Sequence, residues 1–311
     1  MSRPASIDLS VTVGALRLSN PILAASGTFG YGLEFAHLVD LNRLGGFVVK
    51  GLSAQPMNGA PAPRLCETPG GMINAVGLQN VGVRAFVAEK LPKLRGYRAA
   101  IVANVFGQSS EEYVEVLRVL EDAEGLAAYE LNISCPNVKR GGAQFGTDPA
   151  LTAEVVSAAR QACRRPLWVK LSPLVTDISA IARAAEQAGA DALTVANTYP
   201  AMSVDFQTRK SRLGNVTGGL SGPAIKPITL RLVHQVSRAV KLPVIGLGGI
   251  EKPEDVLEYI VVGAAAVQVG TAHFIDPQAS ERLVTGVEKL CAANNISIIN
   301  NLRGQIEEET V

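Results

Sequence analysis

Short apolar runs rich in β-branched residues recur eight times along the chain, and helical patterns lie between them. The runs lack a clean alternation of apolar and polar residues, which is typical of strands buried on both faces of a parallel sheet. Helical patterns such as 109–123 and 177–189 begin at polar N-cap residues, and glycines such as Gly189 and Gly263 stop helices. The eight strands are predicted at residues 21–26, 46–51, 99–107, 127–134, 166–172, 190–198, 243–249 and 265–270.

Eight strands that alternate with helices over about 250 residues predict an α/β fold, the (β/α)8 TIM barrel. The alternative is a doubly wound sheet, but GTFGYG at 27–32 has the wrong spacing for the GxGxxG fingerprint of that fold. No internal repeat or low-complexity linker divides the chain, so we expect one domain over residues 1–311. Residues 7–20 alternate around a glycine turn and predict a β-hairpin that plugs the floor of the barrel.

Composition argues against several classes of function. The 311 residues carry a net charge of +1 and only 5% aromatic side chains, which favours neither nucleic acid nor an anionic membrane as a partner. The N-terminus lacks the apolar core of a signal peptide, and no apolar run approaches the roughly 20 residues that span a bilayer. We therefore expect a cytoplasmic protein. The four cysteines form no CxxC pair, so we expect neither a disulfide framework nor a metal or iron–sulfur site in this chain.

Three connections that follow predicted strands are unusually long and rich in Gly, Pro and Asn. They span about 52–80, 135–148 and 198–222. The active site of a TIM barrel lies at the carboxyl ends of its strands. We therefore expect these segments to form the walls or a lid of the site.

Glycine-rich segments at the last two strands predict a phosphate site. Small residues stand where these strands end, in IGLGGI at 245–250 and VQVGTA at 267–272, and GGLSGPAIKP at 218–227 can approach the same group. Backbone N–H groups in such loops can hold a phosphate. The alternative is close packing at the top of the barrel. A P-loop is excluded because no GxxxxGK[ST] segment is present.

Lysines and asparagines cluster at the ends of other predicted strands. Lys50 and Lys170 both end strands, where a buried ammonium group is costly unless it reaches a polar site or an anion. A lysine can instead extend its charge outward to solvent. Asparagines stand at the same level or in adjoining loops, and several amides at one barrel mouth fit a small polar ring that bears carbonyl groups. They are Asn74, Asn104, Asn132, Asn137 and Asn197.

Cys135 directly follows the fourth predicted strand and precedes Pro136 and the glycine-rich segment GGAQFG. A cysteine is often only a small hydrophobic residue, as we expect for Cys163. At the catalytic end, near lysines, a thiol can act as a nucleophile or as a general base. None of the three histidines (His37, His234 and His273) is near Cys135 in the sequence, which argues against the nucleophile, and we interpret the histidines as structural.

Eight motifs, in chain order and over nearly the whole chain, together resemble one family. They are ASGTFGYG, VVKG, GMINAVGLQN, ELNISCPNV, VKLSP, NVTGGLSGPAIKP, GLGGI and VGTA. This set is similar to the catalytic subunit of class 1 dihydroorotate dehydrogenase. GLQN, FGTDP and VKLSP resemble the NAD-linked B type more than the A type that uses fumarate. A class 2 enzyme would use serine as its base and carry an N-terminal membrane segment.

The resemblance implies flavin mononucleotide (FMN) at the barrel mouth and dihydroorotate stacked on it. The phosphate would be held by Gly222, Gly248, Gly249, Gly270 and Thr271, and the rest of the flavin by Ser26, Lys50, Gly51, Asn104, Asn132, Lys170 and Ala196. Lys170 would stabilise the anionic reduced flavin. The substrate would be held by Lys50, Asn74, Asn132, Asn197 and Thr198, with Ala75, Val76, Gly77 and Leu78 in the substrate loop.

The chemistry that the resemblance implies is the oxidation of (S)-dihydroorotate to orotate in pyrimidine biosynthesis. Cys135 would remove the proton at C5 while a hydride passes from C6 to flavin N5. The chain departs from the family pattern at Val81, where we expect proline after GLQN. Valine is expected to leave this loop more mobile than proline would.

The resemblance also implies partners. In the B type, a second subunit with FAD and a 2Fe–2S cluster passes electrons to NAD⁺, and the family forms dimers of catalytic subunits within a heterotetramer. Three alternatives stay open. They are a flavin subunit of the dihydropyrimidine dehydrogenase kind acting on uracil or thymine, an A-type enzyme that uses fumarate, and a phosphate-binding barrel without redox chemistry.

Overall fold

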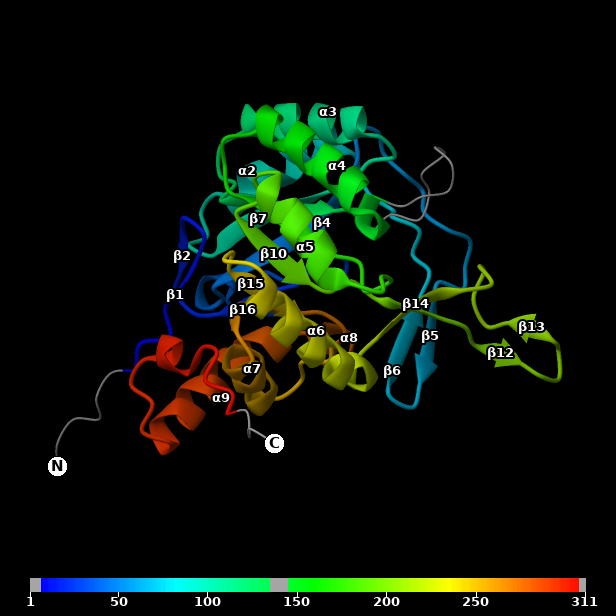
Figure 1. The fold of residues 1–311 in the computed structure, drawn as a ribbon. Coiled ribbons are helices and arrows are strands. Elements are labelled where there is room, and N and C mark those ends of the chain that lie inside the picture. The colour runs from blue at the N-terminus through cyan, green and yellow to red at the C-terminus, as the bar shows by residue number, and fades with distance from the viewer. Residues whose placement is uncertain (1–6, 135–144, 308–311) are drawn as a thin grey trace.

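The computed structural model describes residues 7–134 and 145–307, which contain a closed barrel of eight parallel strands (Figure 1). Each strand pairs with the next in the sequence, and the last pairs with the first. The predicted barrel and all eight predicted strands are confirmed. The strands are β3 (Ile22–Ala24), β4 (Gly46–Leu52), β7 (Ala100–Val105), β8 (Ala128–Asn132), β9 (Leu167–Lys170), β10 (Ala192–Val195), β15 (Val244–Leu247) and β16 (Ala264–Val269).

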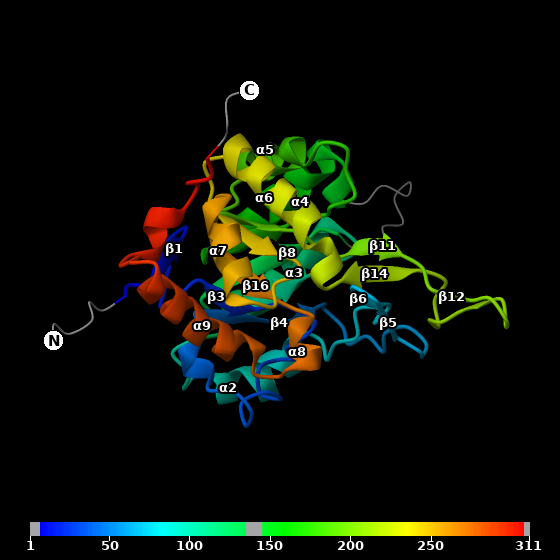
Figure 2. The same ribbon diagram turned by 90° about the horizontal axis from the view of Figure 1, so that it is seen from below.

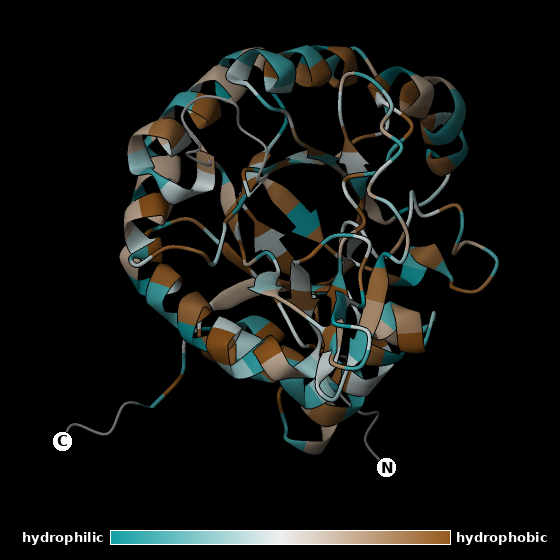
Figure 3. Cartoon of the chain, turned by 90° about the vertical axis from the view of Figure 1, so that its right-hand side faces the viewer, coloured by the Kyte–Doolittle hydropathy of each residue, from teal (hydrophilic) through white to brown (hydrophobic). Residues whose placement is uncertain are grey.

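Helices surround the barrel and turn their apolar sides toward it (Figure 3). The N-cap predictions are confirmed, since the side chains of Ser109 and Asp177 accept hydrogen bonds from the first turns of α3 and α5. Within residues 7–134 and 145–307, no helix is long and apolar enough to cross a membrane. The helices are α1 (Val83–Ala85), α2 (Leu91–Leu94), α3 (Ser110–Glu121), α4 (Pro149–Ala162), α5 (Ile178–Gln187), α6 (Lys226–Ala239), α7 (Pro253–Val261), α8 (Ala272–Ile275) and α9 (Ala279–Ala293), with short turns η1 (Leu41–Arg43), η2 (Phe86–Lys90), η3 (Phe145–Thr147), η4 (Pro223–Ile225) and η5 (Ile299–Leu302).

The predicted N-terminal hairpin is present as β1 (Val11–Val13) and β2 (Leu16–Leu18). Val11, Val13 and Leu18 are buried. A Cβ atom at Gly14 would come within 3.2 Å of the carbonyl oxygen of Asp191, the residue that precedes β10. The hairpin turn therefore packs against the end of the barrel at which the strands begin.

A second sheet of four antiparallel strands covers the other end of the barrel. It forms within two of the segments predicted as long connections, 52–80 and 198–222. The sequence did not predict these strands because they are three or four residues long, are not fully buried and pair with distant segments, as Asn74 does with Gly219. Figures 1 and 2 show the arm that contains β12 and β13 projecting beyond the second sheet. Its strands are β5 (Leu65–Thr68), β6 (Gly71–Asn74), β11 (Tyr199–Ala201) and β14 (Gly218–Ser221), and the projecting arm contains β12 (Val204–Asp205) and β13 (Lys210–Ser211).

Candidate active site

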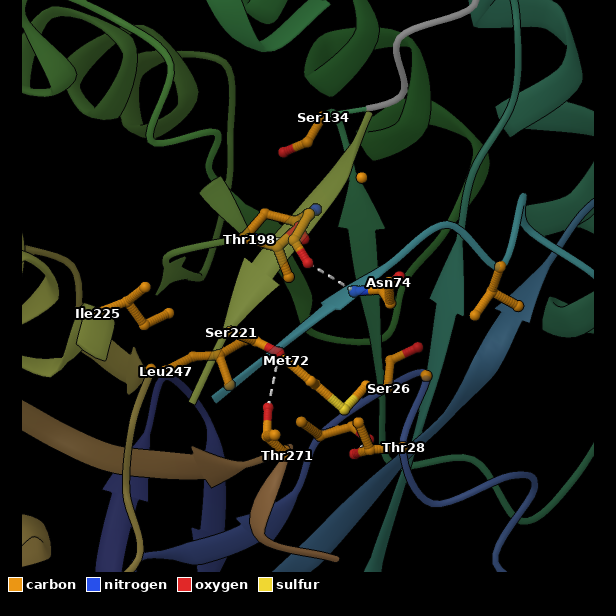
Figure 4. A pocket seen from close by; sticks show the side chains of 18 of the residues that line it. Ser26, Thr28, Met72, Asn74, Ser134, Thr198, Ser221, Ile225, Leu247 and Thr271 are labelled. Carbon is orange, nitrogen blue, oxygen red and sulfur yellow. Dashed lines mark hydrogen bonds between the residues drawn. The ribbon is translucent and has the colours of Figure 1, made fainter. Parts of the chain in front are cut away.

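A cavity of about 580 Å³ opens at the carboxyl ends of the barrel strands, beneath the second sheet (Figure 4). This volume is in the range of small-molecule and cofactor sites. Cys135 and Asn137 lie outside the described residues. Every other predicted site residue lines the cavity: Ser26, Lys50, Gly51, Asn74, Ala75, Val76, Gly77, Leu78, Asn104, Asn132, Lys170, Ala196, Asn197, Thr198, Gly222, Gly248, Gly249, Gly270 and Thr271.

One side of the cavity, the glycine wall, consists of Gly222, Gly248, Gly249, Gly270 and Thr271. Gly222 and Gly249 have φ angles of +103° and +66°, which disfavour any residue with a side chain. A Cβ atom at Gly249 would also lie 2.8 Å from the carbonyl oxygen of Gly222. Close packing therefore accounts for these two glycines.

Gly270 differs from them, because protein packing does not require a glycine there. Its φ angle is ordinary, and a Cβ atom would meet no protein atom nearer than Ala25 Cβ, at 3.8 Å. That Cβ atom would instead project among residues that line the cavity. Within the described part of the chain, no group accepts a hydrogen bond from the backbone N–H of Gly249, Gly270 or Thr271. Three free donors and an open space beside Gly270 fit a bound anion such as a phosphate.

The opposite side of the cavity is built from amide side chains. Asn197 donates to Asn132 Oδ1 over 3.1 Å, which joins the ends of β10 and β8 across β9. Asn74 donates to the carbonyl oxygen of Gly219 over 3.1 Å and lies near Thr198 in the view of Figure 4. These bonds use part of the hydrogen-bonding capacity of each amide and leave the rest for a ligand.

Lys50 and Lys170 stand in the cavity without partners among the described residues, since neither forms an ion pair or a side-chain hydrogen bond with them. Burial lowers the pKa of Lys170, which is 6% exposed, and the charge of Glu130 opposes that fall. Burial also lowers the pKa of Lys50, helped by the positive charges of Lys170 and Arg64. A bound anion would stabilise both ammonium groups.

The loop after β6 is fixed by hydrogen bonds to Ser53 and Tyr31, which the sequence did not single out. Asn80 donates to Ser53 Oγ over 2.8 Å and accepts from the backbone N–H of Gly82 at 2.8 Å. The backbone N–H of Val81 donates to Tyr31 Oη over 3.1 Å. Proline has no N–H, so the valine that departs from the family pattern makes a bond that proline could not. The sequence contained no signal for this contact because Tyr31 and Val81 are 50 residues apart.

A fully buried carboxylate, Glu130, lies beneath the cavity and was also missed. Its Oε1 atom accepts from Asn104 Nδ2 at 2.8 Å. Its Oε2 atom accepts from Thr194 Oγ1 at 2.8 Å and from Gln268 Nε2 at 2.6 Å. The signal was present in the sequence, because a glutamate within an apolar strand requires polar partners.

His273 and Cys163 are buried outside the cavity, which supports their interpretation as structural residues. His273 pairs with Ser280 Oγ at 2.9 Å, and burial lowers its pKa to about 4. Burial raises the pKa of Cys163 to about 11. Neither group is suited to exchange protons with a ligand near neutral pH.

Comparison with known proteins agrees with the sequence motifs. The family model described as dihydroorotate dehydrogenase matches residues 8–291. A protein of Solibacter usitatus named putative dihydroorotate dehydrogenase A (fumarate) is 57% identical over 96% of this chain and 98% of its own length. Two proteins named dihydroorotate dehydrogenase B (NAD(+)), catalytic subunit, also match. The one from Pelobacter propionicus is 53% identical over 96% of this chain and 99% of its own length, and the one from Geobacter sp. (strain M21) is 51% identical over 99% and 100%.

The match covers nearly the whole barrel and includes every described residue that lines the cavity. It is therefore a property of the complete fold and its site, and not of one shared motif. The chain belongs to the dihydroorotate dehydrogenase family of oxidoreductases.

Proposed function

We propose that this protein oxidises (S)-dihydroorotate to orotate with FMN bound in the cavity. The observation that carries the proposal is that two lysines without partners among the described residues, the buried Lys170 and the half-buried Lys50, share one cavity with a wall of free backbone donors. A flavin phosphate and a substrate carboxylate are two anions that such a cavity can take. Membership of the dihydroorotate dehydrogenase family supports the same reaction.

The residues present fit FMN. The free N–H groups of Gly249, Gly270 and Thr271 and the open space at Gly270 fit its phosphate. Bound FMN would supply the acceptor for the hydride that leaves C6 of the substrate. Lys170 would place a fixed positive charge beside the flavin ring. The rest of the ring would be held by Ser26, Lys50, Gly51, Asn104, Asn132 and Ala196, and Gly222 and Gly248 would complete the phosphate site.

The substrate would lie between the flavin and the second sheet. Lys50 would pair with its carboxylate, and Asn74, Asn132, Asn197 and Thr198 would hold the ring amides. The loop Ala75–Leu78 would cover the ring, with Asn80 holding the end of this loop in place. Together these groups would orient the substrate and exclude water from it.

We propose Cys135 as the general base that takes the proton from C5. This rests on the family resemblance and on its place in the sequence, three residues after Asn132 at the end of β8. A positioned base contributes about 10²–10⁴-fold to such a step. Cys135→Ala is therefore expected to retain FMN and to lose that factor in the rate of flavin reduction by dihydroorotate, measured anaerobically by stopped flow. Cys66→Ala, which changes a thiol outside the cavity, is the matched control.

The proposed physiological acceptor is NAD⁺, reached through a partner subunit that carries FAD and a 2Fe–2S cluster, with dimers of this chain inside a cytoplasmic heterotetramer. The relatives named as NAD(+)-linked catalytic subunits support this assignment. The relative named for fumarate instead supports fumarate as an acceptor that takes electrons directly from this chain. NADH formation by this chain copurified with an iron–sulfur flavoprotein supports the first, and turnover of the isolated chain with fumarate supports the second.

A dihydropyrimidine dehydrogenase subunit is the second candidate, because its pyrimidine substrates would use the same amide side chains of Asn74, Asn132 and Asn197. Uracil and thymine lack the carboxylate for which Lys50 is proposed. Orotate is expected to perturb the flavin spectrum of the holoenzyme, and uracil is not. Perturbation by uracil alone would contradict the proposed substrate, and a purified protein that takes up no flavin would contradict the redox function.

A further inference from the structure

Glu130 is the central acceptor of a polar layer inside the barrel. It lies on β8 and has no exposed surface. Its partners Asn104, Thr194 and Gln268 come from β7, β10 and β16. β8 and β16 are four strands apart in either direction around the barrel, so the 2.6 Å bond between Glu130 and Gln268 crosses the interior.

A buried polar layer of this kind is unusual in a barrel. The interior layers of TIM barrels are dominated by branched aliphatic side chains. A buried carboxylate is costly unless its lone pairs are satisfied, and truncating one partner leaves an unpaired group. An aliphatic layer would avoid this cost, so the polar layer indicates a role other than the stability of the barrel.

The layer lies directly beneath cavity residues. Glu130 is two residues before Asn132 on one strand, and Gln268 is two residues before Gly270 on the opposite one. Because side chains alternate along a strand, residues two apart point to the same face. Asn104 belongs to the layer and to the cavity wall at once. Glu130 can therefore act on the cavity through Asn104 without contacting a ligand itself.

The bond between Glu130 and Asn104 determines which way the Asn104 amide points. Both oxygens of Glu130 accept hydrogen bonds within the layer, so the amide turns its NH2 group toward Glu130. The Oδ1 atom of Asn104 is then left on the cavity side, where a Cβ atom at Gly51 would lie 2.8 Å from it. The cavity is thus offered a hydrogen-bond acceptor at this position and not a donor.

We infer that Glu130 is a positioning residue, which fixes Asn104 as an acceptor for a ring N–H of the flavin bound in the cavity. The inference rests on the proposed FMN site. The same carboxylate also acts on Lys170 through its charge, without consuming the hydrogen bonds of that ammonium group in an ion pair. Asn104 and Lys170, on which Glu130 acts, are already among the residues proposed to hold the flavin.

The direct test is Glu130→Gln, which keeps the size of the side chain and removes its charge. One oxygen becomes an NH2 group, so at least one of the three donors loses its acceptor. FMN release from the holoenzyme is measured by dilution, through the return of free-flavin fluorescence. We expect FMN to bind about tenfold or more weakly, with a changed spectrum of the bound flavin.

A double-variant cycle separates positioning from general loosening. If Glu130 acts through Asn104, Glu130→Gln should weaken FMN binding little further once Asn104→Ala is present. Asn20→Ala is the control, because it removes buried hydrogen bonds at the other end of the barrel. It is expected to leave the affinity for FMN and the flavin spectrum unchanged. Additive losses in the cycle, or an equal loss in the control, would overturn the inference.

A measurement on the unaltered protein covers the case in which Glu130→Gln does not fold. In the holoenzyme, the side-chain NH2 resonances of Asn104, assigned by their loss in Asn104→Ala, should show a proton that exchanges slowly with solvent. Fast exchange of both protons would overturn the inference. If wild-type protein binds no FMN, the proposed function fails. If wild type binds FMN and is reduced by dihydroorotate while Glu130→Gln behaves identically, only this inference fails.

Discussion

The two ends of the barrel differ in whether their polar side chains have partners within the protein. At the end where the strands begin, the Asn20 amide is 4% exposed and fully used. It accepts from the backbone N–H groups of Ile22 and Gly45 and donates to the carbonyl oxygen of Arg43. At the other end, Lys50 and Lys170 have no partner among the described residues.

The difference indicates which end is built for stability and which for binding. Buried polar groups in folded proteins are nearly always paired, so a group without a partner requires an explanation. At the hairpin end every hydrogen bond of Asn20 stabilises the fold itself. At the cavity end, the two lysines and the free N–H groups of the glycine wall can be paired by a bound ligand. Substitutions at the two ends should therefore separate stability from binding.

The largest effect is expected for Lys170→Met. Removing a fixed charge beside the reacting centre should slow flavin reduction by dihydroorotate by about 10²–10³-fold, measured by stopped flow. The flavin-free protein should be at least as stable to urea as the wild type, because a buried unpaired ammonium is replaced by an apolar side chain. Asn20→Ala should do the reverse, with a loss of about 1–3 kcal/mol in unfolding free energy and an unchanged rate. Equal destabilisation by both substitutions would contradict the comparison.

The next effect concerns the glycine wall and compares two of its glycines. Gly270→Ala meets no protein atom within 3.8 Å, so the fold should tolerate it while the added methyl group enters the phosphate site. FMN should then dissociate about tenfold or more readily, with an unchanged unfolding midpoint of the flavin-free protein. Gly249→Ala should lower both stability and affinity, because its φ of +66° and its 2.8 Å approach to Gly222 strain the chain itself. Unchanged FMN affinity in Gly270→Ala would place the phosphate elsewhere.

The third prediction follows from the lowered pKa of Lys50. Above that pKa the free protein carries neutral Lys50, so binding of the orotate carboxylate must take up a proton. Orotate affinity should therefore fall as the pH rises through the alkaline range, by at most about tenfold per pH unit for one proton, and the slope should be smaller in Lys50→Met. The ligand-free protein should become more stable over the same rise, because the unfolded chain holds its lysine protons up to a higher pH. Affinity that increases with pH would contradict the pairing of Lys50 with a carboxylate.

The barrel could be predicted because its strands are buried on both faces and leave continuous apolar runs. The cavity followed from it, since Lys50, Asn104, Asn132 and Lys170 occupy strand ends that a closed parallel barrel must bring together. The second sheet could not be predicted. Its strands are short and incompletely buried, and the pairing of Asn74 with Gly219 joins segments 145 residues apart.

Glu130 shows the limit of reading strands one at a time. Its unusual position inside an apolar strand was visible, but its partners lie on three other strands. Only the register, in which Asn104 stands opposite Glu130, and the closure of the barrel bring them into one layer. The same holds for Val81, where the sequence suggested a looser loop and the structure shows a hydrogen bond from its backbone N–H to Tyr31 Oη.

The smallest effect is expected for Val81→Pro, which removes the donor of that bond at the cavity end. The loss of about 1 kcal/mol should be partly offset by the stiffer unfolded chain that proline creates. The Michaelis constant for dihydroorotate should change by less than about fivefold, while unfolding of the holoenzyme is nearly unaffected. Tyr31→Phe removes the acceptor of the same bond, so adding it to Val81→Pro should cost nothing further if the bond is its only relevant contact. A large loss in the double variant beyond either single one would show that the Tyr31 hydroxyl stabilises the loop through a contact other than Val81, because phenylalanine keeps the ring that packs against Phe86.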